Sequence, residues 1–137
     1  MLIGVPKEIK EQESRIGLTP NSVYELVNDG HKVLVEDNAG YGAGFDNSVY
    51  ENAGARIVKQ ASDIFHDAEM IVKVKEPLQN EAVMLRENQI LFTYLHLAAA
   101  PTLTAELVKS KAVCIARGFG LVLGTSFRLG KIGVVSM

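Results

Sequence analysis

The sequence of 137 residues has a single cysteine, no run of basic residues, and no apolar run of the ~20 residues needed to cross a bilayer. One cysteine excludes an internal disulfide and favours a reducing compartment. The net charge of −2 gives no electrostatic reason to bind nucleic acid or an anionic membrane. No charged segment leads into an apolar stretch at the N-terminus, so we expect no signal peptide. Together these absences predict a cytoplasmic protein with neither nucleic acid nor membrane as a partner.

What is present describes a soluble globular domain. Hydrophobic residues make up 47% of the chain and charged residues 22%, and the length suits one domain with its own core. Cys114 lies within the apolar run Ala112–Ala116. We therefore interpret it as a small buried side chain and not as a nucleophile.

Short apolar runs alternate with helical patterns over the first 116 residues. Strands are expected at residues 1–6, 32–36, 55–59, 70–74, 90–95 and 112–116. Helices are expected from Thr19-Pro20 to the stop at Gly30, from the cap Asp46 to Gly54, at 61–68, at 80–86, and after Pro101. This alternation predicts an α/β fold, a mostly parallel sheet flanked by helices of the flavodoxin-like or Rossmann-like kind.

Three cationic or protonatable side chains are predicted to gather at one edge of that sheet. Lys75 and His96 each follow a buried strand directly, and Arg15 lies in the long loop after the first strand. In open parallel sheets, ligands bind beyond the carboxyl ends of the strands. Arginine and lysine can hold a carboxylate, and a histidine beside them can exchange a proton near neutral pH. The trio suits a small 2-oxo or 2-amino acid.

Each of the three has a structural alternative. Arg15 could pair with Glu11 or Glu13 on the surface, and Lys75 could be a solvated loop lysine, as Lys73 could be too. His96 could be a structural histidine that bridges the strand end to backbone. The residue pattern alone leaves these alternatives open.

Two glycine-rich stretches have some likeness to nucleotide-binding loops. Residues 40–44, "GYGAG", lack the third glycine at the required offset, and we interpret them as a turn-rich loop. Residues 118–124, "GFGLVLG", are followed by a poor helix pattern, so the helix N-terminus that would hold a pyrophosphate is missing. Residues 117–137 hold five glycines and no acidic residue, and we assign no helix there. No cofactor-binding or metal-ligating residue is assigned.

Four segments in order resemble the N-terminal part of bacterial alanine dehydrogenase, and the match runs from residue 1 to about 116. They are "IGVPKEIKEQESRIGLTP", "DNAGYGAGFDNSVYENAGARIV", "IVKVKEP" and "LFTYLHLAAAPTLTAELV". The related domain of nicotinamide nucleotide transhydrogenase shares the opening motif and the glycine-rich loop, but not the lysine of "KVKEP" or the histidine of "YLHLA". Lys75 and His96 therefore favour alanine dehydrogenase.

The resemblance implies roles for the three candidates. Arg15 and Lys75 would hold the substrate carboxylate and carbonyl oxygen, and His96 would bind the reacting oxygen and act in acid–base catalysis. The implied reaction converts L-alanine, NAD and water to pyruvate, ammonia and NADH, in a homo-oligomer that is a hexamer in the family.

The chain also departs from the family's pattern. Residues 1–116 read as an incomplete substrate domain and 117–137 as a divergent glycine-rich apolar tail, with the Rossmann NAD domain absent. The resemblance therefore implies a substrate-binding part that is inactive alone and binds NAD poorly. The alternatives are a non-catalytic remnant or interaction module, and a fragment of a transhydrogenase alpha subunit. A frameshift would explain the tail.

Overall fold

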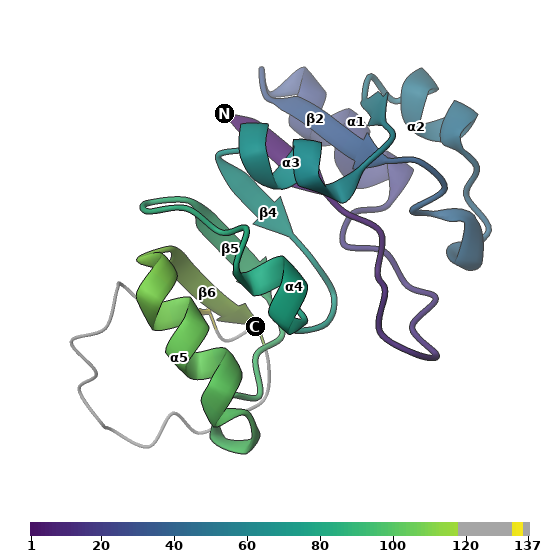
Figure 1. Ribbon diagram of the computed structural model, residues 1–137. Helices are drawn as coiled ribbons and strands as arrows, with labels where there is room; N and C mark the ends of the chain where they lie inside the picture. Colours follow the sequence, from purple (N-terminus) through teal and green to yellow (C-terminus); the bar gives the residue numbers. More distant parts are fainter. Residues whose placement is uncertain (118–132, 136–137) are drawn as a thin grey trace.

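The computed structural model describes residues 1–117 and 133–135, and its centre is one parallel sheet (Figure 1). The seven strands lie in the order β3-β2-β1-β4-β5-β6-β7, and every neighbouring pair is parallel. The strands are β1 (Leu2–Val5), β2 (Lys32–Glu36), β3 (Arg56–Val58), β4 (Met70–Val72), β5 (Ile90–Thr93), β6 (Val113–Arg117) and β7 (Gly133–Val135). The predicted α/β class with a parallel sheet is confirmed.

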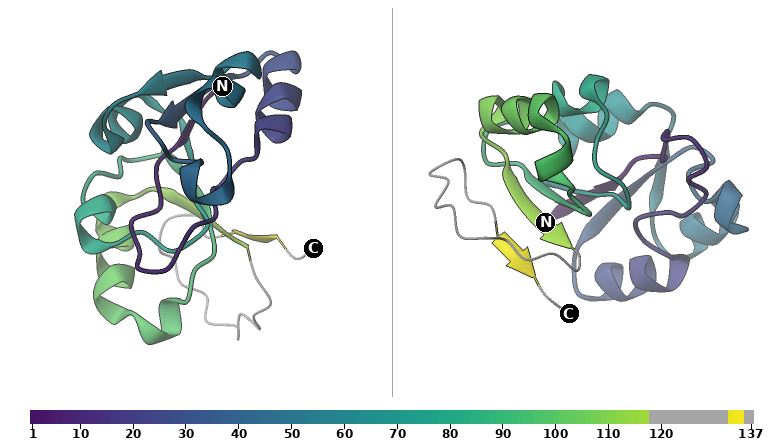
Figure 2. Two further views of the ribbon diagram at one scale, coloured as in Figure 1. Left: turned by 90° about the vertical axis from the view of Figure 1, so that its right-hand side faces the viewer. Right: turned by 90° about the horizontal axis from the view of Figure 1, so that it is seen from below.

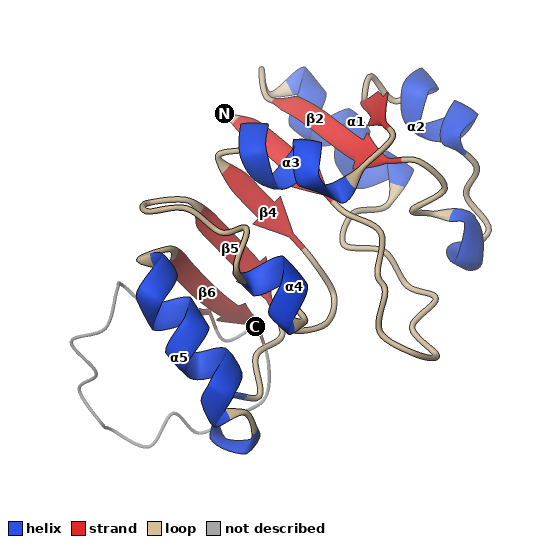
Figure 3. Cartoon of the chain, in the orientation of Figure 1, coloured by secondary structure: helices blue, strands red, loops and turns tan. Residues whose placement is uncertain are grey.

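Helices connect the strands (Figure 3). The α-helices are α1 (Pro20–Asn28), α2 (Asn47–Asn52), α3 (Ala61–Asp67), α4 (Gln79–Ala82) and α5 (Pro101–Ser110), and two 3-10 turns are η1 (Tyr41–Ala43) and η2 (Leu97–Ala99). Within the described ranges, none of these helices has the length and apolar character to span a membrane.

The helix boundaries follow from local chemistry. The Thr19 hydroxyl accepts a hydrogen bond from the Ser22 amide at 3.3 Å, and Asp46 accepts one from the Val49 amide at 3.2 Å. These side chains satisfy backbone donors that the first turn of a helix leaves unpaired. Gly54 follows the end of α2 with a φ of +101°, a conformation that favours glycine. The predicted caps at Thr19 and Asp46 are therefore confirmed.

Two helical layers bury the two faces of the sheet. Helices α1 and α2 pack on one face with Val5, Val33 and Val35, whereas α3, α4 and α5 pack on the other with Ile71 and Leu91. In Figure 2 the green and teal helices lie on one side of the sheet and the blue helices on the other. Both faces of the central strands are thus covered, which explains their continuous apolar sequences.

Four expectations need correction. Strand β4 ends at Val72 instead of Val74, because the Val74 amide donates to the carboxylate of Glu8 after β1 has turned away at Pro6. Strand β5 and helix α4 also end earlier than predicted. The sheet does not end at β6, since β7 pairs with it. Apart from β7 and Arg117, the predicted tail lies outside the described residues, as does the "GFGLVLG" stretch.

Candidate functional site

The carboxyl ends of three adjacent strands position the candidate residues. Strands β1, β4 and β5 are neighbours in the sheet, and they lead into residues 6–19, 73–78 and 94–100. Arg15, Lys75 and His96 lie on these three segments, one on each. The prediction that the three follow the same edge of the sheet is therefore consistent with the strand order.

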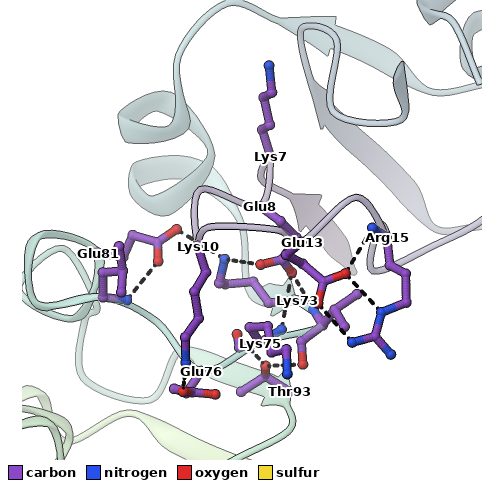
Figure 4. A network of polar contacts seen from close by, with 12 residues as sticks. Lys7, Glu8, Lys10, Glu13, Arg15, Lys73, Lys75, Glu76, Glu81 and Thr93 are labelled. Carbon is purple, nitrogen blue, oxygen red and sulfur yellow. Dashed lines mark hydrogen bonds and ion pairs between the residues drawn. The ribbon is translucent and has the colours of Figure 1, made fainter. Parts of the chain in front are cut away.

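A buried ion network lies beneath this edge (Figure 4). The Lys73 ammonium is 2.9 Å from Oε2 of Glu8 and 3.1 Å from Oε1 of Glu81. The side chains of Lys73, Glu8 and Glu81 are 1%, 2% and 3% exposed. The interpretation of Lys73 as a solvated loop lysine is thus wrong. Desolvation costs several kcal/mol per ion, and the two carboxylates that offset it come from positions 65 and 8 residues away along the chain.

The backbone of Lys75 is fixed next to this network. Its amide donates to Oε1 of Glu8 at 3.4 Å, and its carbonyl accepts from the Thr93 hydroxyl at 2.8 Å. The side chain is half-buried, and its ammonium has no hydrogen-bond or ion-pair partner among residues 1–117. Lys75 therefore carries a positive charge on a side chain whose backbone is held in place.

Arg15 is engaged by a carboxylate two residues away. Its Nε and Nη2 donate to the two oxygens of Glu13 at 2.8 Å each, and its amide donates to Oε1 at 2.9 Å. This contact matches the predicted surface pairing with Glu13. The Arg15 side chain is 63% exposed, whereas that of Glu13 is 5% exposed.

The pKa of the Glu13 carboxyl is shifted by the charges around it. The hydrogen bond from Arg15, with smaller contributions from the Arg15 and Lys75 charges, outweighs burial and lowers the pKa of Glu13 to about 2. Glu13 in turn raises the pKa of Arg15. The ionised carboxylate of Glu13 is thus favoured at this position chiefly by its contact with Arg15.

His96 follows the third of these strands, β5. It is exposed at the start of η2, and its ring makes no hydrogen bond within the described part of the chain, so the alternative of a structural bridging histidine finds no support. Its charge acts on Glu76, which Lys10 also contacts. Burial raises the pKa of Glu76, but the Lys10 hydrogen bond, a backbone hydrogen bond, and the charges of Lys10 and His96 lower it overall.

The other two histidines lie elsewhere, as expected. His31 precedes β2 at the opposite edge, where its ring contacts the N-terminal amine at 3.3 Å. His66 is exposed at the end of α3 and contacts Asp67 at 2.7 Å. Cys114 is buried in β6, and desolvation raises its pKa to about 11, which confirms the structural interpretation.

A pocket of about 280 Å³ opens beside Arg15. Its walls are mainly apolar, and neither Lys75 nor His96 lines it. The structure therefore places Arg15 at this pocket but does not bring all three candidates around it. The lining residues are Arg15, Ile16, Gly17, Thr19, Ala43, Phe45, Val72, Lys73, Val74, Phe92 and Tyr94.

Sequence reasoning did not nominate Glu8, Glu81 or Tyr94. The buried partners Glu8 and Lys73 are 65 positions apart, so no local pattern links them. For Tyr94, the position directly after β5 was an available signal, because it lies at the same edge as His96.

The glycine-rich loop at residues 40–44 does not fit the pyrophosphate of a dinucleotide. It forms the turn η1, and the following helix α2 has only six residues. The Asp46 carboxylate occupies the N-terminus of that helix, where it would repel a phosphate. A Cβ atom at Gly40 would lie 2.6 Å from the Tyr50 ring, so this glycine serves close packing. In the described segments, no group of three His, Cys, Asp or Glu side chains is placed to hold a metal ion.

The fold and this edge define a parallel α/β domain of the kind that binds small ligands beyond the carboxyl ends of its strands. Residues 4–119 match the family described as alanine dehydrogenase/PNT, N-terminal domain, and the chain belongs to this family.

Individual relatives agree with this assignment. Alanine dehydrogenase of Bacillus subtilis (strain 168) is 55% identical over 113 residues, which are 82% of this chain and 29% of the relative. A solved L-alanine dehydrogenase is similar with a TM-score of 0.82 and 53% identity, over 85% of this chain and 32% of that one. The structure of a transhydrogenase from Sinorhizobium meliloti is similar with a TM-score of 0.79 and 26% identity, over 85% of this chain and 34% of that one. The chain thus spans about a third of the length of the relatives that it matches.

Proposed function

We propose that this chain is the substrate-binding part of an alanine dehydrogenase and binds pyruvate and L-alanine. One observation supports the proposal most strongly: Arg15, which lines the pocket described above, already binds a carboxylate, that of Glu13, through two parallel N–H donors. A site that lowers the pKa of a carboxyl to about 2 favours carboxylate anions. The substrate carboxylate would take up the remaining donors of Arg15.

The proposed roles of the three residues follow from their chemistry. Arg15 binds the substrate carboxylate through two parallel N–H donors. Lys75 places a positive charge beside the carbonyl oxygen of pyruvate. When L-alanine is bound, the same charge lies beside the carbon that carries the amino group. His96, exposed and near the Glu76 carboxylate, gives or takes the proton at that oxygen.

The reaction of the whole enzyme requires NAD as the hydride acceptor, and the glycine-rich loop at residues 40–44 does not fit its pyrophosphate. We therefore expect the 137-residue polypeptide by itself to be inactive in alanine oxidation. Positioning of reactants accounts for ~7–11 kcal/mol of a barrier, and this contribution is lost without a bound cofactor. The rise of NADH absorbance in the presence of L-alanine and NAD measures the rate of alanine oxidation. Robust turnover by the purified chain would contradict the expectation.

Calorimetric titration with pyruvate tests the binding proposal. We expect measurable binding by the chain and at least about tenfold weaker binding by Arg15→Ala, since a charge-assisted hydrogen bond is lost. Arg56→Ala is the matched control, because Arg56 is an exposed arginine on β3, away from this edge. Equal affinity of the two variants, or no binding by the wild-type chain, would contradict the proposal.

The alternative is a non-catalytic remnant or interaction module. The observation in its favour is that Glu13 already occupies two donors of Arg15. The absence of a pyruvate signal would favour this alternative. The similarity to transhydrogenase keeps a fragment of that protein as a further candidate. This candidate would gain support if substitution of His96 left the activity unchanged in a protein with the cofactor domain restored.

We further propose that the chain is cytoplasmic and self-associates. On the same sheet face as α1 and α2, strands β5 and β6 present the half-buried side chains of Ile90, Phe92, Val113 and Ile115. On the other face Leu91 and Cys114 are fully buried. A partly exposed apolar face of this kind favours association. Sedimentation should show oligomers, and a clean monomer at high concentration would contradict this.

A further inference from the structure

The main chain of Lys75 is held from two sides. Oε1 of Glu8 accepts hydrogen bonds from the amides of Val74 and Lys75, the second at 3.4 Å. On the opposite side, the Thr93 hydroxyl donates to the carbonyl of Lys75 at 2.8 Å. Strand β4 ends at Val72, and the backbone beyond it is fixed by these side-chain contacts together with the hydrogen bond from the Tyr94 amide to the Val74 carbonyl at 3.2 Å.

Glu8 is itself fixed by the buried ion network. Its Oε2 contacts the Lys73 ammonium at 2.9 Å, and Lys73 also contacts Glu81. The second oxygen of Glu81 accepts from the Leu78 amide at 2.9 Å. The network therefore holds both ends of the segment 73–78, and Figure 4 shows the Glu8 carboxylate, which comes from the same loop as Arg15, directed at this segment.

The energetics indicate that this network contributes more to the position of the Lys75 backbone than to the stability of the fold. Burying three charges costs a large desolvation energy, and well-packed apolar side chains of similar volume usually stabilise a fold as well or better. A fully satisfied buried ionic network can, however, specify geometry, because each charge is stable at depth only beside its partners. Here the fixed element is the backbone of Lys75.

We propose that Glu8 is a positioning residue that sets Lys75 relative to Arg15 by binding the Lys75 main chain. This inference rests on the proposed binding of pyruvate at the same edge. Glu8 does not contact the substrate; it acts through the amides of Val74 and Lys75. Thr93 completes the arrangement from the β5 side.

Two matched variants test the proposal in the full 137-residue chain. Glu8→Asp and Glu81→Asp each keep the charge beside Lys73 and withdraw the acceptor by one methylene. Only Glu8 contacts the Lys75 amide, so we expect about tenfold weaker pyruvate binding for Glu8→Asp and less than about threefold for Glu81→Asp. Both are compared at a temperature where circular dichroism shows them folded. Equal weakening, or no weakening in either, would overturn the proposal.

Amide hydrogen exchange provides a readout that does not depend on pyruvate. In Glu8→Asp the amides of Val74 and Lys75 should exchange faster, whereas in Glu81→Asp the affected amide should be that of Leu78. If the wild-type chain fails to bind pyruvate, the proposed function fails, and exchange alone decides this inference. Unchanged exchange at Lys75 in Glu8→Asp would then refute it.

Discussion

Replacing Lys73 with methionine removes the ammonium that lies between the buried carboxylates of Glu8 and Glu81. The three side chains are 1–3% exposed, so the two carboxylates would remain in a desolvated site without their counter-charge. Glu8 would keep its backbone donors at Val74 and Lys75, and Glu81 would keep that of Leu78. Removing one partner of a buried pair typically costs ~3–5 kcal/mol, and we expect a loss of that size.

Urea denaturation at neutral pH measures the change in the free energy of unfolding. Lys59→Met is the control, because Lys59 is an exposed lysine and its substitution should change stability by less than ~0.5 kcal/mol. If Lys73→Met fails to fold, the variant that also carries Glu8→Gln and Glu81→Gln should recover folding, since the unpaired charges are gone. A loss below ~1 kcal/mol for Lys73→Met alone would refute the reasoning, because it would mean that water reaches the network.

Three further predictions concern single residues. The pKa of Glu13 falls from 4.5 to about 2 in the fold, so its contribution to stability is present above pH 4.5 and is lost as the pH falls toward 2. Thermal unfolding of Glu13→Gln should lack this part of the acid dependence, and an unchanged profile would count against the Arg15 contact. Cys114, with a pKa of about 11, should resist thiol reagents until the chain unfolds, whereas rapid labelling of the native chain would argue against its burial. Gly17→Ala would bring a Cβ atom to 2.5 Å from the Val72 carbonyl oxygen and should cost ~1–3 kcal/mol; an unchanged melting temperature would contradict this close approach.

Much of the fold was predictable because its signals are local. The caps Thr19 and Asp46 and the alternation of apolar runs with helical patterns each depend on a few neighbouring residues. The parallel sheet follows from that alternation, and it places Arg15, Lys75 and His96 after three adjacent strands.

The rest depended on contacts between distant segments. The prediction for Lys73 was wrong because its partner Glu8 lies 65 positions away, and an isolated lysine after a strand resembles a solvated one. Strand β7 has only three residues within a glycine-rich stretch, which is too short to show a period. The position of His96 outside the lining of the pocket beside Arg15 also depends on the path of the chain after β5, which the sequence pattern does not specify.

Amide chemical-shift mapping of a pyruvate titration tests the central claim most directly. If Arg15 and Lys75 hold a small carboxylate at the carboxyl ends of β1, β4 and β5, the shifts should concentrate in residues 13–19 and 73–76, with a smaller effect at 94–97. Shifts spread over unrelated surfaces, or none at saturating pyruvate, would contradict the claim.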